Sequence, residues 1–341
     1  MTPRFERILF LAFEHEAMHL ETILYMLVQS KKTIATSGLS LTMNSFLSSS
    51  SLLCNNQELP PPAVMATVDG ATFPFGINDD EKDDFNTTKT SSSSSSSSTT
   101  LKSCFGWDNE KPQRMVTVSS FKMQHRPVTN QEYFQFLKSK IDTSDYESYV
   151  PAAWGEFPDG CFGVKTIFGL IPFSISGLWP VSVSYDLAHA YAESKGLRLP
   201  TEFEWMAARH QFVDNKSLKS SNFGFSSWHP QNVLLSCDTN NNHSSSSGSS
   251  TVSSSTQSPM ITSLVGDGWE LTSSDFDSYE GFQSSELYPG YSSDFFDHKH
   301  KVVLGGSWAT HPRIALRHSF RNWYQTGYPF VFSKFRCVSD S

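Results

Sequence analysis

The first thirty residues show a repeat of three to four positions, which is the period of an α-helix. One face would carry residues that recur every three or four positions: Ile8, Leu11 or Ala12, His15, His19, Thr22 and Met26. This spacing predicts a single amphipathic helix over residues 3–30. Because an isolated amphipathic helix is only marginally stable in water, we expect it to pack against another part of the protein.

The rest of the chain shows a different pattern, with short apolar runs separated by turn residues. Runs such as 64–68 and 71–76 predict short strands. Capping residues predict helices that begin after Thr129, Ser184 and Thr201, and the first and third of these have a glutamate three positions later. The predicted fold class is therefore α+β, with few helices and much irregular structure.

Shifts in composition predict the limits of the segments. The helix occupies residues 1–30, a Ser/Thr-rich linker covers 31–59, and the main domain covers 60–341. Two tracts inside that domain have a biased composition: one near 79–103 contains the pure serine run 91–98, and one near 238–258 is rich in serine and asparagine. Such tracts cannot bury enough apolar surface to offset the entropy of ordering, so we expect disordered insertions there.

Composition excludes several classes of function. The formal net charge is -8 and the chain has no cluster of Lys and Arg, which argues against a nucleic-acid partner. Five scattered cysteines without CxxC spacing argue against structural zinc and against a disulfide framework, and a reducing cytoplasm fits them best. The uncharged stretch Thr166–Tyr185 is interrupted by glycine and proline, so no membrane span is predicted.

His15 and His19 are the first candidates for chemistry. Residues at i and i+4 project from one helical face about 6 Å apart, so both imidazoles could bind one metal ion. The alternative is a pair of histidines in a helix that simply packs against its neighbours. Glu21 lies on another side of the helix and suits a supporting role better than that of a third ligand.

Four ordered segments resemble the formylglycine-generating-enzyme domain, also called the sulfatase-modifying factor domain. They are residues 196–209, 268–272, 305–308 and 335–338. The resemblance implies a C-type-lectin-like fold. Formylglycine-generating enzymes carry reactive cysteines shortly after the Gly-Gly-Ser segment, whereas here none follows before Cys337. Sulfatase maturation is therefore disfavoured.

The combination of this domain with a His-x-x-x-His-x-Glu helix of DinB-like type resembles the sulfoxide-synthase family of ergothioneine biosynthesis. Further matching segments are 105–112, 126–130, 179–185 and 321–324. The chain looks most similar to the C-terminal half of the fungal-type bifunctional enzyme, preceded by one helix of a truncated DinB-like bundle.

This resemblance implies a specific active site. His15 and His19 would be two of three histidines that hold a non-heme Fe(II), because imidazole suits that ion. Asn322, Trp323 and Tyr324 would contact substrate, with Trp323 offering an aromatic face to the quaternary ammonium of hercynine. Tyr288 is implied as the proton donor, with Tyr291 as its rival within the same segment. The implied substrates are hercynine, cysteine or a cysteine-containing peptide, and O2.

The sequence departs from the family pattern at three points. Bacterial relatives often carry a polar residue where Met18 stands and an aspartate where Tyr324 stands. The third histidine belongs to an earlier helix of the bundle, which this chain does not contain. The other histidines considered do not match its motif and are interpreted as ordinary surface or core residues: His125, His189, His210 and His229.

Two other functions remain open from the sequence. One is a non-catalytic, lectin-like binding module without a complete metal centre. The other is a thiol S-transferase of the plain DinB type, which is disfavoured because such enzymes do not need the C-terminal domain.

Overall fold

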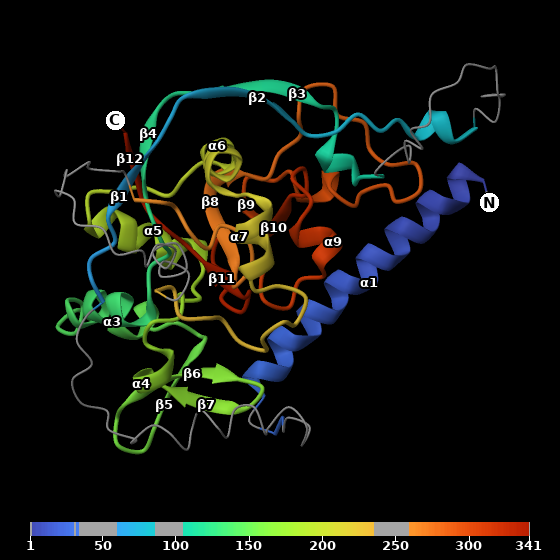
Figure 1. Cartoon of the computed structure of the whole chain (residues 1–341). Helices are drawn as coiled ribbons and strands as arrows, with labels where there is room; N and C mark the ends of the chain where they lie inside the picture. Colours follow the sequence, from blue (N-terminus) through green and yellow to red (C-terminus); the bar gives the residue numbers. More distant parts are fainter. Residues whose placement is uncertain (1, 31, 34–59, 86–104, 235–258, 341) are drawn as a thin grey trace, which may run out of the picture.

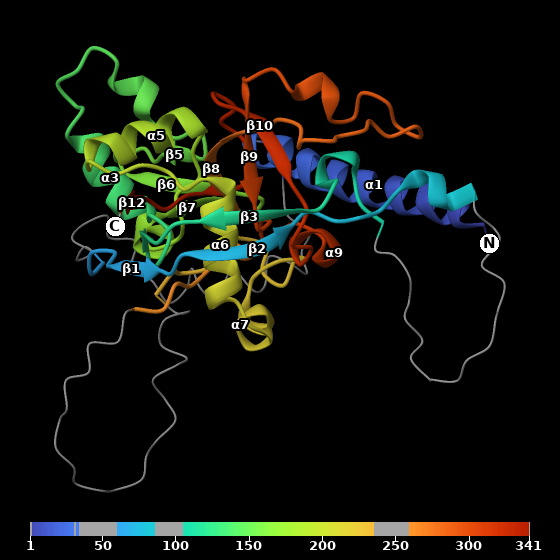
Figure 2. The same cartoon turned by 90° about the horizontal axis from the view of Figure 1, so that it is seen from above.

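The structure is a computed structural model that describes residues 2–30, 32–33, 60–85, 105–234 and 259–340. One long helix, α1 (Pro3–Gln29), lies obliquely along one side of a mixed α/β domain (Figure 1). Its N-terminal end contacts the 3-10 helix η1 (Glu81–Phe85), and its C-terminal end contacts strand β6 (Phe162–Thr166). The view from above shows the same helix beside β10 (Asn322–Gln325) (Figure 2). The predicted helix is confirmed.

α1 packs through a different face from the one that its apolar spacing suggested. Ile8 and Met26, which lie on the face that the spacing defined, are 42% and 66% exposed. The buried side instead carries Arg7, Glu14 and Glu21, spaced by seven residues and each no more than 3% exposed. Two turns of helix separate positions seven apart, so these charged groups form one stripe against the domain.

The sheets are small and mostly antiparallel. The central sheet has the order β10-β9-β8-β11 and includes β8 (Trp269–Asp275), β9 (His300–Leu304) and β11 (Ser333–Lys334), with β11 parallel to β8. A second sheet has the order β1-β4-β12, and the remaining strands form a two-stranded and a three-stranded sheet. Their bounds are β1 Met65–Val68, β4 Phe121–Gln124, β12 Val338–Asp340, β2 Ala71–Phe75, β3 Arg114–Val118, β5 Trp154–Glu156 and β7 Gly169–Pro172.

Side-chain caps begin the three helices that the sequence predicted. Thr129 Oγ1 accepts from Glu132 N at 3.2 Å and Thr201 Oγ1 from Glu204 N at 3.1 Å, both within capping boxes. Ser184 Oγ accepts from Leu187 N at 3.4 Å. The helices are α3 (Asn130–Lys138), α6 (Glu202–Phe212) and α5 (Tyr185–Ser194). Shorter helical segments are α4 Phe173–Ser176, α7 Asn215–Ser220, α9 Pro312–Ala315, η2 Asp108–Glu110, η3 Tyr146–Tyr149 and η4 Ser293–Phe295.

The mixture of helices and mostly antiparallel sheets confirms the α+β class. The hydrophobic core includes residues of the central sheet, and the side chains of Trp107, Trp205 and Trp269 are fully buried in it. None of the described helices combines the length and the hydropathy that a membrane crossing requires. Cys337 is a free, buried thiol, whereas Cys161 is disulfide-bonded, contrary to the expectation from cysteine spacing.

One predicted insertion is partly ordered. Residues 79–85 include η1, and Asp79 and Asp84 bind the guanidinium of Arg7, with Asp79 Oδ2 and Asp84 Oδ2 each 2.6 Å from a guanidinium nitrogen. The composition of this tract does not reveal the role, because it does not record the distant partner Arg7. The rest of that tract, the tract at 238–258 and nearly all of the expected linker lie outside the described residues.

Candidate active site

A cavity of about 480 Å³ lies between α1, the segment from Tyr288 to Phe295, and β10. Its lining includes every site residue that the sequence predicted: His15, His19, Tyr288, Asn322, Trp323 and Tyr324. About 300 residues of chain separate the two histidines from β10, so only the packing of α1 on the domain joins them.

The two histidines are arranged as a potential metal site. Their ring centroids lie 4.2 Å apart, and the possible ligand atoms of His15, Glu16 and His19 all lie within 4.8 Å of one another. Burial, and then the proximity of His19, lowers the pKa of His15 below its usual value. A lowered pKa keeps the imidazole neutral near pH 7, which is the form that binds a metal ion.

Tyr288 and Tyr291 have different surroundings. Tyr288 is 40% exposed, and its ring meets the His15 ring edge-on with centroids 5.5 Å apart. Tyr291 is buried, stacks on Trp107 at 3.9 Å, and directs its hydroxyl to Met18 Sδ at 3.6 Å. Burial, aided by nearby carboxylates, raises the pKa of Tyr291 well above its usual value. Tyr288 is therefore the tyrosine with the freer hydroxyl beside the histidines.

Trp323 forms part of an aromatic wall. Phe276 stacks on one face of the indole, with centroids 4.1 Å apart and planes 9° apart. Tyr291 and Phe295 flank it with centroids at 5.3 Å and 5.4 Å. These contacts fix the ring and leave part of it on the cavity surface, since Trp323 is only partly buried.

A chain of hydroxyl groups connects Tyr324 to the buried carboxylate of Glu21. Tyr25 donates its only hydroxyl proton to Glu21 Oε1 at 2.8 Å, and the Tyr25 and Tyr324 hydroxyl oxygens are 2.9 Å apart. Tyr324 must therefore donate to Tyr25, which leaves the Tyr324 oxygen as an acceptor toward the cavity. Asn322 Nδ2 lies 3.5 Å from that oxygen, at the outer limit of a hydrogen bond.

Glu21 also anchors α1 to the domain. Its carboxylate accepts from Trp269 Nε1 at 2.8 Å, Ser307 Oγ at 2.6 Å and Thr310 Oγ1 at 2.7 Å. Burial raises the pKa of Glu21, and these donors oppose that shift. The supporting role expected for Glu21 agrees with these contacts, but the helical pattern does not indicate the partners, which lie about 250–290 positions away.

Glu14 is a second anchor that sequence reasoning missed. Its carboxylate accepts from Trp107 Nε1 at 2.9 Å and from Arg317 Nη2 at 2.7 Å, and Arg317 Nε also donates to Glu110 at 2.9 Å. Together with Arg7 and Glu21, it sets the rotation of α1 that directs the histidines to the cavity. The seven-residue spacing of these charged residues is the feature of the sequence that could have indicated their shared role.

The four histidines that the sequence analysis interpreted as ordinary residues lie elsewhere. His229 stacks on Trp179 with centroids 4.6 Å apart, and His125 Nδ1 accepts from Val64 N at 2.9 Å. Neither these two nor His189 and His210 line the cavity.

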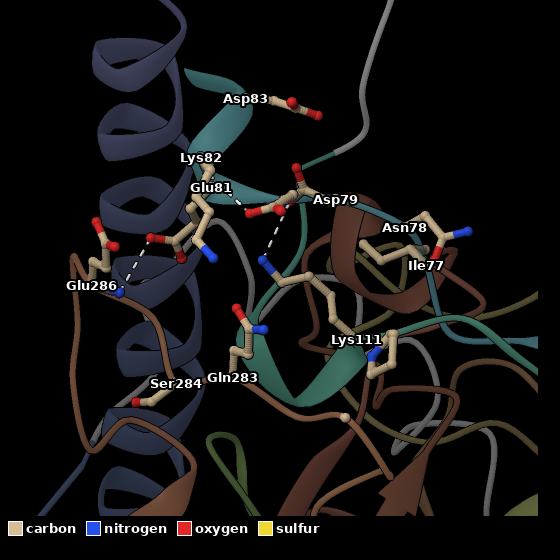
Figure 3. Close-up of a pocket in the computed structure, with 13 residues that line it drawn as sticks. Ile77, Asn78, Asp79, Glu81, Lys82, Asp83, Lys111, Gln283, Ser284 and Glu286 are labelled. Carbon is tan, nitrogen blue, oxygen red and sulfur yellow. Dashed lines mark hydrogen bonds and ion pairs between the residues drawn. The ribbon is translucent and has the colours of Figure 1, made fainter. Parts of the chain in front are cut away.

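A different hollow of about 370 Å³ lies where residues 77–83 meet residues 281–286 (Figure 3). Several carboxylates surround it, but the nearest cations neutralise part of the charge: Lys111 Nζ is 3.7 Å from Asp79 and Arg4 Nη1 is 3.3 Å from Glu81. None of the predicted site residues lines this hollow, so we do not assign the chemistry to it.

A known protein family matches most of the chain. Residues 60–341 match the family model of the sulfatase-modifying factor enzyme 1-like domain. The chain belongs to this family. The expected sulfatase-modifying factor fold is thereby confirmed.

The relatives of this chain include proteins named for ergothioneine biosynthesis. The chain is 35% identical over 357 residues to ergothioneine biosynthesis protein 1 of Schizosaccharomyces pombe, covering 98% of this chain and 40% of that protein. It is 34% identical over 431 residues to the protein of the same name from Neurospora crassa, covering 98% and 43%. Hercynine oxygenase of Mycolicibacterium smegmatis is 32% identical over 250 residues, covering 68% and 56%. The expected resemblance is confirmed, and the chain spans about two fifths of the length of the fungal relatives.

Proposed function

We propose that this chain carries the C-terminal part of an Fe(II)- and O2-dependent sulfoxide synthase of ergothioneine biosynthesis. The enzyme would join hercynine to cysteine or to a cysteine-containing peptide. The observation that supports this most is that His15, His19, Tyr288 and Trp323 line one cavity. The names of the relatives, ergothioneine biosynthesis protein and hercynine oxygenase, support the same pathway and an oxygenase-type reaction.

The residues present fit part of an Fe(II) site. Two imidazoles with ring centroids 4.2 Å apart, one with a lowered pKa, offer the nitrogen ligands that Fe(II) accepts. Bound there, Fe(II) would supply the activation of O2. Glu16 is close enough to be a third ligand within the described residues, but the family resemblance favours a third histidine from another helix.

The outer face of α1 supports the proposal that it belongs to a DinB-like bundle. Large apolar side chains that are 40–66% exposed cover that face: Phe5, Ile8, Leu9, Phe13, Leu20, Ile23, Met26 and Leu27. A helix that exposes so much apolar surface needs a partner, because contiguous apolar patches are uncommon on monomeric proteins. We propose that the other helices of the bundle cover this face and supply the third imidazole.

Residues of this chain would bind the substrate and deliver a proton. Trp323 would hold the quaternary ammonium of hercynine by a cation–π contact. The Tyr324 oxygen, as an acceptor, would take a hydrogen bond from a substrate N–H. Tyr288 would deliver a proton at its hydroxyl, whereas the Tyr291 hydroxyl is directed to Met18. The reaction balances as one C–H and one S–H bond broken, one C–S bond formed, one oxygen atom on sulfur and the other in water.

The test uses a longer chain that restores the bundle. It should consume O2 only when hercynine, a thiol and Fe(II) are all present, and the product should carry a new C–S bond. Tyr288→Phe should retain hercynine binding but divert the reaction to thiol oxidation, because it removes a proton donor and keeps the ring. Tyr291→Phe is the matched control and should retain C–S bond formation.

Each contrary result has a distinct meaning. A defect in Tyr291→Phe but not in Tyr288→Phe would reverse the assignment of the tyrosines and leave the reaction standing. Absence of hercynine-dependent O2 consumption with any thiol would refute the enzyme proposal. Retained hercynine binding in that case would favour the lectin-like binding module.

A further inference from the structure

The charged groups of the cavity are unbalanced. Of the residues that the structure describes, no lysine or arginine lines it, and its carboxylates are those of Glu21 and Asp294. Glu21 is 3% exposed and its oxygens already accept four hydrogen bonds. Asp294 is therefore the carboxylate that a ligand in the cavity can reach.

The Asp294 carboxylate lies against a turn that accommodates it. Gly290 has a φ of +81°, and a Cβ atom at that position would lie 2.8 Å from Asp294 Oδ2. Any other residue would collide with the carboxylate and would strain the backbone at that φ. Among the described residues, no ion pair or side-chain hydrogen bond engages Asp294, so this placement leaves its charge without a partner.

Aromatic rings surround the same part of the cavity. Phe295, the next residue, lies 5.4 Å from Trp323 between centroids, and Tyr291 meets Trp323 edge-on. Aromatic faces are negative in their quadrupole, so they favour a cation and add to the attraction of a carboxylate. In the chain without a metal ion, an anionic ligand group would find no cationic partner here, because no lysine or arginine among the described residues lines the cavity.

We propose that Asp294 is the counter-ion of a substrate ammonium group and thereby determines specificity for a cationic ligand end. This inference deepens the proposed function and rests on it, because hercynine and cysteine both carry an ammonium group. Hercynine would present a quaternary ammonium and cysteine a primary one. The shared chemistry is an alkylammonium that lies between the carboxylate and the rings of Phe295 and Trp323.

The test compares small probes of equal shape and different charge on the full 341-residue chain. Choline is measured against its uncharged isostere 3,3-dimethylbutan-1-ol, and 2-aminoethanol serves as the primary ammonium, by NMR titration at low salt. We expect choline to bind about 3–10-fold more tightly than the isostere, the ratio that one partly solvated charge pair produces. In Asp294→Asn, which keeps the shape of the side chain, the ratio should fall to the smaller preference that the aromatic rings alone provide.

Asp297→Asn is the matched control. It removes the same charge three residues away. Asp297 lies 2.8 Å from His300 Nδ1 and accepts from Lys299 N at 2.9 Å, and it does not line the cavity. An Asp294-dependent preference for choline would assign the hercynine ammonium, and one confined to 2-aminoethanol would assign the ammonium of the thiol substrate. No charge preference in the parent chain, an unchanged ratio in Asp294→Asn or an equal fall in Asp297→Asn would overturn the proposal.

These measurements need neither iron nor turnover. A result that overturns the Asp294 proposal therefore does not decide whether the enzyme consumes O2 with hercynine. Conversely, intact discrimination by charge with no hercynine-dependent O2 consumption would refute the sulfoxide-synthase proposal and retain Asp294 as an ammonium site.

Discussion

Replacement of Glu21 by alanine should weaken the attachment of α1 to the domain. The change removes a carboxylate that accepts hydrogen bonds from Tyr25, Trp269, Ser307 and Thr310. Hydrogen bonds to a charged group contribute about 1.5–3 kcal/mol each, so four would give an upper limit of about 6–12 kcal/mol. The loss should be smaller, because some of the freed donors can find other partners.

The structure shows which donors can adapt. The Thr310 and Ser307 hydroxyl oxygens are already 3.3 Å apart, and Tyr25 can turn toward Tyr324. Trp269 has only an N–H to offer, and that buried donor would have no acceptor. We therefore expect a loss of about 3–5 kcal/mol, similar to the loss of one partner from a buried charged pair.

Chemical denaturation and hydrogen exchange measure this effect. Exchange of α1 amides should accelerate before that of β8, because the anchor connects the helix to the domain. Glu21→Gln should lose less than Glu21→Ala, because it keeps one acceptor oxygen for Trp269. Glu16→Ala, on the exposed side of the same helix, is the control and should change stability by less than about 0.5 kcal/mol. A loss below about 1 kcal/mol in Glu21→Ala, with unchanged exchange of α1, would refute the anchoring role.

Three further predictions follow from the same structure. His15→Ala combined with His19→Ala should lower the affinity of the chain for Fe(II) or Co(II) at least 10–100-fold, as calorimetry would measure, and unchanged binding would place the metal elsewhere. Ile23→Glu, at a position 47% exposed, should reduce aggregation without loss of stability, whereas Leu24→Glu, at a position 7% exposed, should destabilise the chain, and equal effects would contradict the orientation of α1. Burial and nearby cations lower the pKa of His318 to about 4, so stability should fall as the pH drops from about 6.5 to 4, and denaturation midpoints of His318→Gln should fall less.

The sequence by itself determined the local elements and the family. Thr129 and Thr201 cap their helices because the glutamate three residues later completes each capping box, an interaction within four residues of chain. The spacing of His15 and His19 likewise fixes their proximity, because one helical turn separates them. Such short-range features do not depend on the rest of the fold.

Only the tertiary structure decided which side of α1 faces the domain. Its apolar residues suggested one face, but Arg7, Glu14 and Glu21 are buried because the domain supplies partners for each of them from distant segments. A buried charge is stable only where such partners are in place, and a one-dimensional pattern does not record them. The same packing brings His15 beside Tyr288, so the cavity exists only once the charged stripe has docked.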